Sequence, residues 1–202
     1  MLRDYLMLVM MSVVGFLLGS VLFAYLIPKV FCHMDITKVS ADGNPGTSNV
    51  CRYCGKKLGI LTGILEYGKG FFPVAIGYAL IDRKAVGGWL GILVAAPVLG
   101  HMFSVFHRGR GGIGIAPMCG TLIASFLFTK LALYVVVLYA IAKFGLKFRY
   151  QCERTQFVFI SFLIGIQFLE KNPVNRLTYG ILSALVLSKT AIRKAQGHVL
   201  AL

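Results

Sequence analysis

One short segment of the sequence combines flexible backbone with polar donors, a composition suited to binding an anion. Residues 43–49 read Gly-Asn-Pro-Gly-Thr-Ser-Asn and are followed closely by Arg52. The amides, hydroxyls and guanidinium of this segment could bind a phosphate or stabilise the oxyanion of an acyl-transfer reaction. The alternative is an ordinary Asn-Pro-Gly turn with Ser and Asn capping the next helix.

A second segment is glycine-rich and basic. Residues 108–114 read Arg-Gly-Arg-Gly-Gly-Ile-Gly, so backbone N–H groups lie unshielded beside two cations at the start of an apolar stretch. If that stretch is a helix, its dipole also favours an anion, and phosphate binding is the physical interpretation. The segment does not match the P-loop pattern, which disfavours nucleotide hydrolysis. A positively charged interfacial turn with no ligand is the alternative.

Three ionisable side chains lie within or next to apolar stretches. His101 follows a glycine at the end of one stretch, and it could act as a general base for a hydroxyl nucleophile or hydrogen-bond a carbonyl at the helix end. Glu66 and Lys69 are three residues apart and share one helix face, where an ion pair satisfies both groups inside a bilayer. We prefer the ion pair, with an anion contact by Lys69 as the second interpretation.

The cysteines do not predict a metal site or a disulfide framework. Cys51 and Cys54 form one C-x-x-C pair, which together with Cys32 and His33 is weak evidence for zinc. The five cysteines are an odd set spread over loops and spans, which favours reduced thiols. We therefore do not expect a metal site.

The composition indicates that these groups are positioned by membrane helices. Hydrophobic residues make up 57% of the 202 residues and charged residues 14%, a balance that indicates lipid as the solvent. Lys and Arg outnumber Asp and Glu by 21 to 7, which predicts cytoplasmic loops beside anionic membrane lipids. The basic residues are scattered between apolar stretches, so nucleic acid is not an expected partner.

Hydropathy predicts an all-α, polytopic integral membrane protein with about six or seven transmembrane helices in one domain, residues 1–202. The clearest span is the first, because roughly 20 apolar residues match the hydrocarbon thickness. Pro28 is expected to end it. The charges at 66 and 69 predict two short helices or a wet interior face, and the long fourth stretch is expected to divide near Thr129-Lys130. The predicted apolar segments are 5–27, 59–81, 85–106, 115–142, 157–169 and 177–187.

Three basic loops separate the predicted spans, near residues 29–58, 107–114 and 143–156. The positive-inside rule places all three on the cytoplasmic side of the membrane. A basic tail is expected after Lys189. The sequence does not define an oligomeric state.

Two motif regions resemble the bacterial acyl-phosphate-dependent glycerol-3-phosphate acyltransferases. Gly43 to Val50 with Arg52, followed by Lys69-Gly70, is similar to the first motif region of that family, and Gly100-His101 with Arg110 to Gly114 is similar to the second. The resemblance covers about residues 15–120. It implies a membrane enzyme that moves an acyl chain from acyl phosphate to the first hydroxyl of glycerol 3-phosphate, giving lysophosphatidic acid without a metal or nucleotide.

The resemblance also implies site residues. The implied catalytic residues are His101, Asn44 and Arg52. The implied phosphate-binding residues are Ser40, Gly43, Gly46, Ser48, Asn49, Lys69, Arg110, Gly111, Gly112 and Gly114.

The chain departs from the family pattern in three places. Asp42 stands where the family has a serine, unless Ser40 is that serine displaced, and a carboxylate there would repel a phosphate. Ile113 replaces a motif lysine, and residues 151–155, Gln-Cys-Glu-Arg-Thr, replace a serine-containing third motif. These departures motivate two alternatives: a non-catalytic relative that binds anionic lipid or a partner enzyme, and an acyltransferase with a changed acceptor. A transporter is less favoured, because the sequence has no repeated halves.

Overall fold

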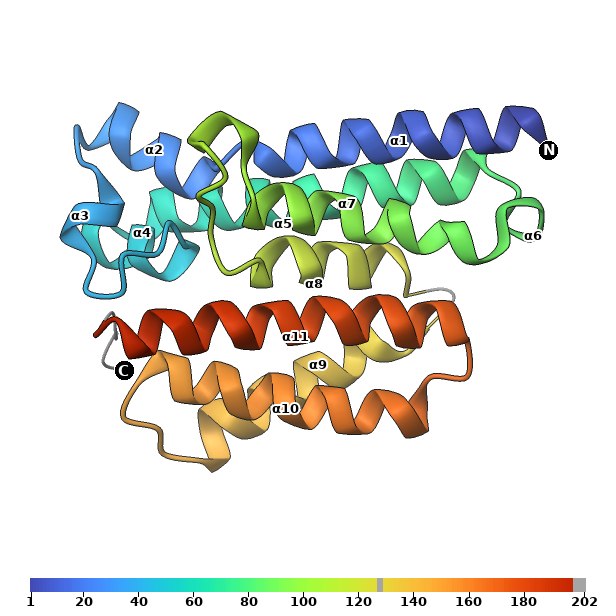
Figure 1. The fold of residues 1–202 in the computed structure, drawn as a ribbon. Coiled ribbons are helices and arrows are strands. Elements are labelled where there is room, and N and C mark those ends of the chain that lie inside the picture. The colour runs from blue at the N-terminus through green and yellow to red at the C-terminus, as the bar shows by residue number, and fades with distance from the viewer. Residues whose placement is uncertain (127–128, 198–202) are drawn as a thin grey trace.

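The computed structural model describes residues 1–126 and 129–197, and these form helices joined by loops (Figure 1). In this part of the chain, seven helices have ten or more residues and lie side by side. They are α1 (Leu2–Ser20), α5 (Lys56–Leu80), α7 (Leu90–Met102), α8 (Ile115–Ala124), α9 (Leu131–Ala140), α10 (Gln151–Leu169) and α11 (Pro173–Ala195).

Short helices gather at the two ends of this bundle. At one end lie α2 (Phe23–Phe31), α3 (Ile36–Val39) and α4 (Thr47–Cys54), together with the C-terminal end of α11 (Figure 1). At the other end lie α6 (Arg83–Val86) and the turn between α10 and α11. Single turns of other helix types occur at Gly87–Trp89, Val105–His107 and Ile141–Gly145.

The distribution of side chains confirms a membrane protein. Leu6, Ile64 and Ile164 are 60–65% exposed on the outside of the bundle, whereas Glu66 and Thr62 are almost completely buried inside it. Apolar side chains on the outside match lipid, and buried polar groups need partners inside. Three described stretches are long and apolar enough to cross a bilayer, and they are Leu2–Phe31, Arg83–His107 and Gln151–Leu169.

The first span is interrupted, and the prediction that Pro28 ends it is wrong. Helix α1 ends at Ser20, Val21 and Leu22 are not helical, and Pro28 lies inside α2. Distant side chains satisfy the backbone groups that the break frees. The Ser104 hydroxyl donates to the carbonyl of Ser20 (2.6 Å), and Lys69 Nζ donates to that of Val21 (2.6 Å). A break in a membrane helix is tolerated when such partners exist.

The charges in the second span do not divide it, so the first of the two predicted alternatives, two short helices, is wrong. Helix α5 runs unbroken from Lys56 to Leu80. Inside it, Lys69 Nζ lies 2.8 Å from Glu66 Oε2, which confirms the predicted ion pair. Glu66 Oε1 also accepts a hydrogen bond from the Ala24 amide (3.1 Å). The two charges therefore hold α5 against the break after α1.

Glycines let the helices approach closely. A Cβ on Gly19 would lie 2.2 Å from the Pro97 carbonyl oxygen, and one on Gly100 would lie 2.1 Å from that of Phe16. Helices α1 and α7 are therefore in backbone contact, as small residues allow in membranes. A Cβ on Gly70 would meet the Pro117 carbonyl at 2.1 Å, so α5 and α8 approach in the same way.

The later helices agree with the prediction in number but not in length. The stretch 115–142 divides into α8 and α9, with Thr129 and Lys130 before α9, as predicted. The expected third basic loop is too long, because α10 already begins at Gln151. Its start is fixed by a capping box in which Glu153 accepts from the Tyr150 amide (3.2 Å). Helix α11 continues to Ala195, so the basic residues after Lys189 lie on the end of the last helix.

Candidate functional site

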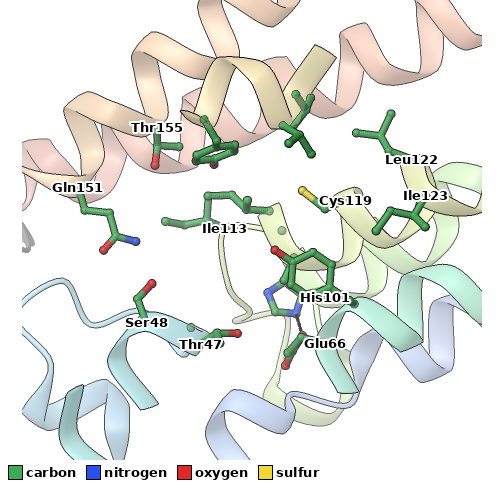
Figure 2. Close-up of a pocket in the computed structure, with 18 of the residues that line it drawn as sticks. Thr47, Ser48, Glu66, His101, Ile113, Cys119, Leu122, Ile123, Gln151 and Thr155 are labelled. Carbon is green, nitrogen blue, oxygen red and sulfur yellow. Dashed lines mark ion pairs between the residues drawn. The ribbon is translucent and has the colours of Figure 1, made fainter. Parts of the chain in front are cut away.

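A cavity of about 610 Å³ opens between the two motif loops and the helices α8, α9 and α10. Its polar end is lined by residues from the start of α4 and the start of α10. Figure 2 shows Thr47 and Ser48 on one side and Gln151 and Thr155 on the other. The rest of the cavity is apolar and is lined by Cys119, Leu122, Ile123, Phe126, Leu133, Val135 and Val136. The cavity thus suits a ligand with a polar end and an apolar chain.

The carboxylate of Asp42 organises the first motif loop. It accepts hydrogen bonds from the Asn44 amide (3.2 Å) and from Asn49 Nδ2 (2.7 Å), and it is 8% exposed. Asn49 Nδ2 also donates to the Asn44 carbonyl (2.8 Å). The charge expected to repel a phosphate is therefore engaged in holding the loop. The side-chain oxygens of Asn44 and Asn49 are buried and have no hydrogen-bond partner among the described residues.

The glycines of the second motif pack on His101. A Cβ on Gly112 would lie 2.2 Å from His101 Nε2, and one on Gly111 would lie 1.9 Å from the His101 carbonyl oxygen. The Gly112 amide donates to that carbonyl (3.2 Å). Gly114 has a φ of +95°, which favours glycine. The first two glycines are thus needed for close packing, and only Gly114 of the three lines the cavity.

A buried cluster of Glu66, Lys69 and His101 forms the floor of the polar end. His101 Nδ1 lies 3.2 Å from Glu66 Oε2 and 2.9 Å from Lys69 Nζ. Glu66 and His101 both line the cavity, and Figure 2 shows their ion pair. These contacts hold Nδ1 and fix the imidazole ring at the cavity wall. Nε2 is the ring nitrogen that takes no part in this cluster.

Helix α11 links the two motif loops, which the sequence reasoning missed. Arg193 donates through Nη1 to the Asp42 carbonyl (2.8 Å) and through Nη2 to the Gly111 carbonyl (3.3 Å). Lys189 Nζ donates to the carbonyls of Gly112 (3.2 Å) and Met102. The density of cations near the end of the sequence was the available signal, but it was interpreted only as a basic tail.

The structure brings together some of the sequence-predicted residues and not others. Those that line the cavity are Asn44, Gly46, Ser48, Asn49, His101 and Gly114. Those that lie outside its lining are Ser40, Gly43, Arg52, Lys69, Arg110, Gly111 and Gly112. Polar lining residues that the prediction missed are Thr47, Glu66, Tyr67, Tyr139, Gln151, Arg154 and Thr155. Arg110 is exposed at the surface.

The five cysteines are free thiols, as predicted. Burial, together with a hydrogen bond to Cys32, raises the pKa of Cys54 to about 11. Cys54 therefore stays protonated and weakly nucleophilic at neutral pH.

Fold and cavity together define a polytopic membrane protein with an internal cavity that is polar at one end and apolar at the other. A family model described as glycerol-3-phosphate acyltransferase matches residues 9–197, and the chain belongs to this family.

Relatives and solved structures agree with this assignment. A glycerol-3-phosphate acyltransferase of Pseudomonas paraeruginosa is 38% identical over 114 residues, which are 56% of this chain and 58% of that relative. One from Lawsonia intracellularis is 34% identical over 111 residues, which are 55% of this chain and 54% of that relative. The chain thus spans little more than half the length of these curated relatives.

Two crystal structures of PlsY (YgiH), an integral membrane glycerol 3-phosphate acyltransferase, superpose over nearly the whole chain. The glycerol 3-phosphate form has a TM-score of 0.80 and 26% identity, covering 96% of this chain and 95% of that one. The lysophosphatidic acid form has a TM-score of 0.74 and 28% identity, covering 96% of this chain and 94% of that one.

Proposed function

We propose that the protein transfers an acyl chain from acyl phosphate to the first hydroxyl of glycerol 3-phosphate and releases lysophosphatidic acid and phosphate. The observation that carries this proposal is the cavity, which joins a polar end between the two motif loops to an apolar end between membrane helices. The acceptor and the product carry a phosphate, and the donor and the product carry an acyl chain. Each reactant therefore has a matching part of the cavity.

The apolar end would hold the acyl chain. Leu122, Ile123 and Val136 come from α8 and α9 and line it. Burying a long chain there would stabilise the bound donor by roughly 0.8 kcal/mol per CH₂ relative to water. The donor is amphiphilic and would enter from the bilayer, so its affinity relative to lipid would be smaller.

The polar end would hold the phosphate and the acyl oxygen. Helix α4 begins at Thr47 with Gly46 as its N-cap, so the amides of Thr47 and Ser48 come before the first helical hydrogen bond, which runs from the Asn49 amide to the Gly46 carbonyl (3.0 Å). The side chains of Thr47 and Ser48 line the cavity beside them. Such a helix start attracts anions, and the cations Arg52 and Arg110 of the motif loops would add a positive potential at the entrance.

His101 would accept the proton of the acceptor hydroxyl. Nδ1 lies between the Glu66 carboxylate (3.2 Å) and Lys69 Nζ (2.9 Å), and in the tautomer that carries its proton on Nδ1 the lone pair is on Nε2. The hydroxyl oxygen attacks the acyl carbonyl carbon, its proton passes to Nε2, and the bond from that carbon to the phosphate oxygen breaks. Asn44 and the α4 amides would stabilise the oxyanion of the intermediate.

The distribution of basic residues supports a cytoplasmic active site in a bacterial plasma membrane. The two motif loops and the basic end of α11 lie at the same end of the bundle (Figure 1). The positive-inside rule would place that end in the cytoplasm. On this proposal residues 1–202 act as one membrane domain.

The proposal is tested with the purified, detergent-solubilised protein. Palmitoyl phosphate, palmitoyl-CoA and palmitoyl carrier protein are each offered with radiolabelled glycerol 3-phosphate, and labelled lysophosphatidic acid is measured. We expect transfer from palmitoyl phosphate, and its loss in His101→Gln. If the folded wild type transfers from none of the three donors, the proposal is wrong for this acceptor.

A further inference from the structure

We infer that Arg154, on the first turn of α10, binds the phosphate group of a reactant in the cavity. This inference rests on the proposed function and adds a residue to it. Neither the two motif loops nor the predicted site includes Arg154.

Arg154 supplies positive charge where the cavity otherwise has little. Among the described lining residues it is the only Lys or Arg. Lys69 lies behind the wall, where it is paired with Glu66 (2.8 Å) and bonded to the Val21 carbonyl (2.6 Å). A dianionic phosphate bound in the cavity would therefore find its nearest unshielded side-chain charge on α10.

The guanidinium of Arg154 has an unused hydrogen-bond donor. Its Nε is buried and has no hydrogen-bond partner among the described residues. A buried N–H of a charged group is costly when it is unpaired, and phosphate oxygens are the acceptors that a guanidinium binds best. The neighbouring carboxylate does not serve it, because Glu153 accepts from the Tyr150 amide (3.2 Å) and lies 3.7 Å from Lys194 Nζ.

The position of Arg154 also explains how the chain can lack the motif lysine at Ile113. Ile113 lines the same cavity, and Figure 2 shows it between His101 and the start of α10. Arg154 and Thr155 follow Gln151 by three and four residues, so one face of α10 turns all three toward the cavity. A cation from α10 thus lines the same cavity as the site of the missing one.

The test compares Arg154→Gln with Arg149→Gln, an exposed arginine five residues earlier that does not line the cavity. The KM values for palmitoyl phosphate and for glycerol 3-phosphate and the kcat are measured for each. We expect Arg154→Gln to raise one KM by roughly tenfold or more, as the loss of a charge-assisted hydrogen bond implies, and Arg149→Gln to change neither by more than about twofold. The KM that rises identifies the donor or the acceptor as the source of the phosphate.

A second variant separates charge from shape. Ile113→Lys in the Arg154→Gln background returns a cation to the cavity, and we expect it to bring the raised KM most of the way back to the wild-type value. Thermal unfolding of each variant in detergent shows whether it is folded, and Arg154→Lys provides a conservative replacement that should retain intermediate affinity.

Two results would overturn the inference while leaving the acyltransferase proposal intact. One is an active Arg154→Gln enzyme with both KM values within about twofold of the wild type. The other is an equal rise in KM for the Arg154→Gln and Arg149→Gln enzymes. By contrast, an inactive but folded wild type would refute the proposed function itself.

Discussion

Replacing Glu66 with glutamine keeps the shape of a buried side chain and removes its charge. The amide oxygen of Glu66→Gln can still accept from the Ala24 amide (3.1 Å). Lys69 Nζ, however, lies 2.8 Å from the lost carboxylate oxygen and would become an uncompensated charge at about 5% exposure. Removing one partner of a buried ion pair costs about 3–5 kcal/mol, which corresponds to a Tm lower by roughly 6–20 °C for a chain of this size.

The assay is thermal unfolding of the purified protein in one detergent, with Glu153→Gln as a matched control. Glu153 lies 3.7 Å from Lys194 at the surface, and glutamine preserves its capping role, so we expect a change below about 1 kcal/mol. The double variant Glu66→Gln/Lys69→Met removes both charges. Its loss in free energy of unfolding should be smaller than the summed losses of the two single variants by about 0.5–3 kcal/mol. If Glu66→Gln unfolds within about 1 kcal/mol of the wild type, the ion pair does not stabilise the bundle.

Other predictions follow from the packing of the motif loops. Gly112→Ala would place a methyl group 2.2 Å from His101 Nε2, so acyl transfer should fall at least tenfold, whereas Gly180→Ala, with nothing within 4 Å, should leave it unchanged. Arg193→Met removes the bridge between the two loops, so limited proteolysis of the loops should become faster. Asp42→Ala removes the acceptor of two loop hydrogen bonds, which should lower the free energy of unfolding by about 1–3 kcal/mol in a detergent melt.

Long apolar stretches and three-residue spacing were sufficient to predict much of the fold. The division near Thr129 and the pairing of Glu66 with Lys69 were both predicted correctly, because each depends on local sequence alone. The break after Ser20 could not be predicted in this way. It is stabilised by side chains that are distant in the sequence, and the local signal at Pro28 pointed to the wrong residue.

The candidate site was predicted where its residues follow one another and missed where they come from a distant helix. Asn44 and Asn49 line the cavity as the first motif suggested. Arg154 and Arg193 approach from α10 and α11, and no spacing in the sequence connects them to the loops that they approach. Asp42 was expected to repel a phosphate, but in the structure its carboxylate accepts hydrogen bonds within its own loop.

The most direct test is whether acyl transfer takes place in this cavity. Cys119→Trp would fill its apolar part, and Ile160→Trp places the same side chain on the outer surface, where Ile160 is 50% exposed. Transfer from palmitoyl phosphate to glycerol 3-phosphate should be lost in the first variant and retained in the second, with both variants folded. A folded Cys119→Trp protein that forms lysophosphatidic acid at the wild-type rate would contradict this assignment of the active site.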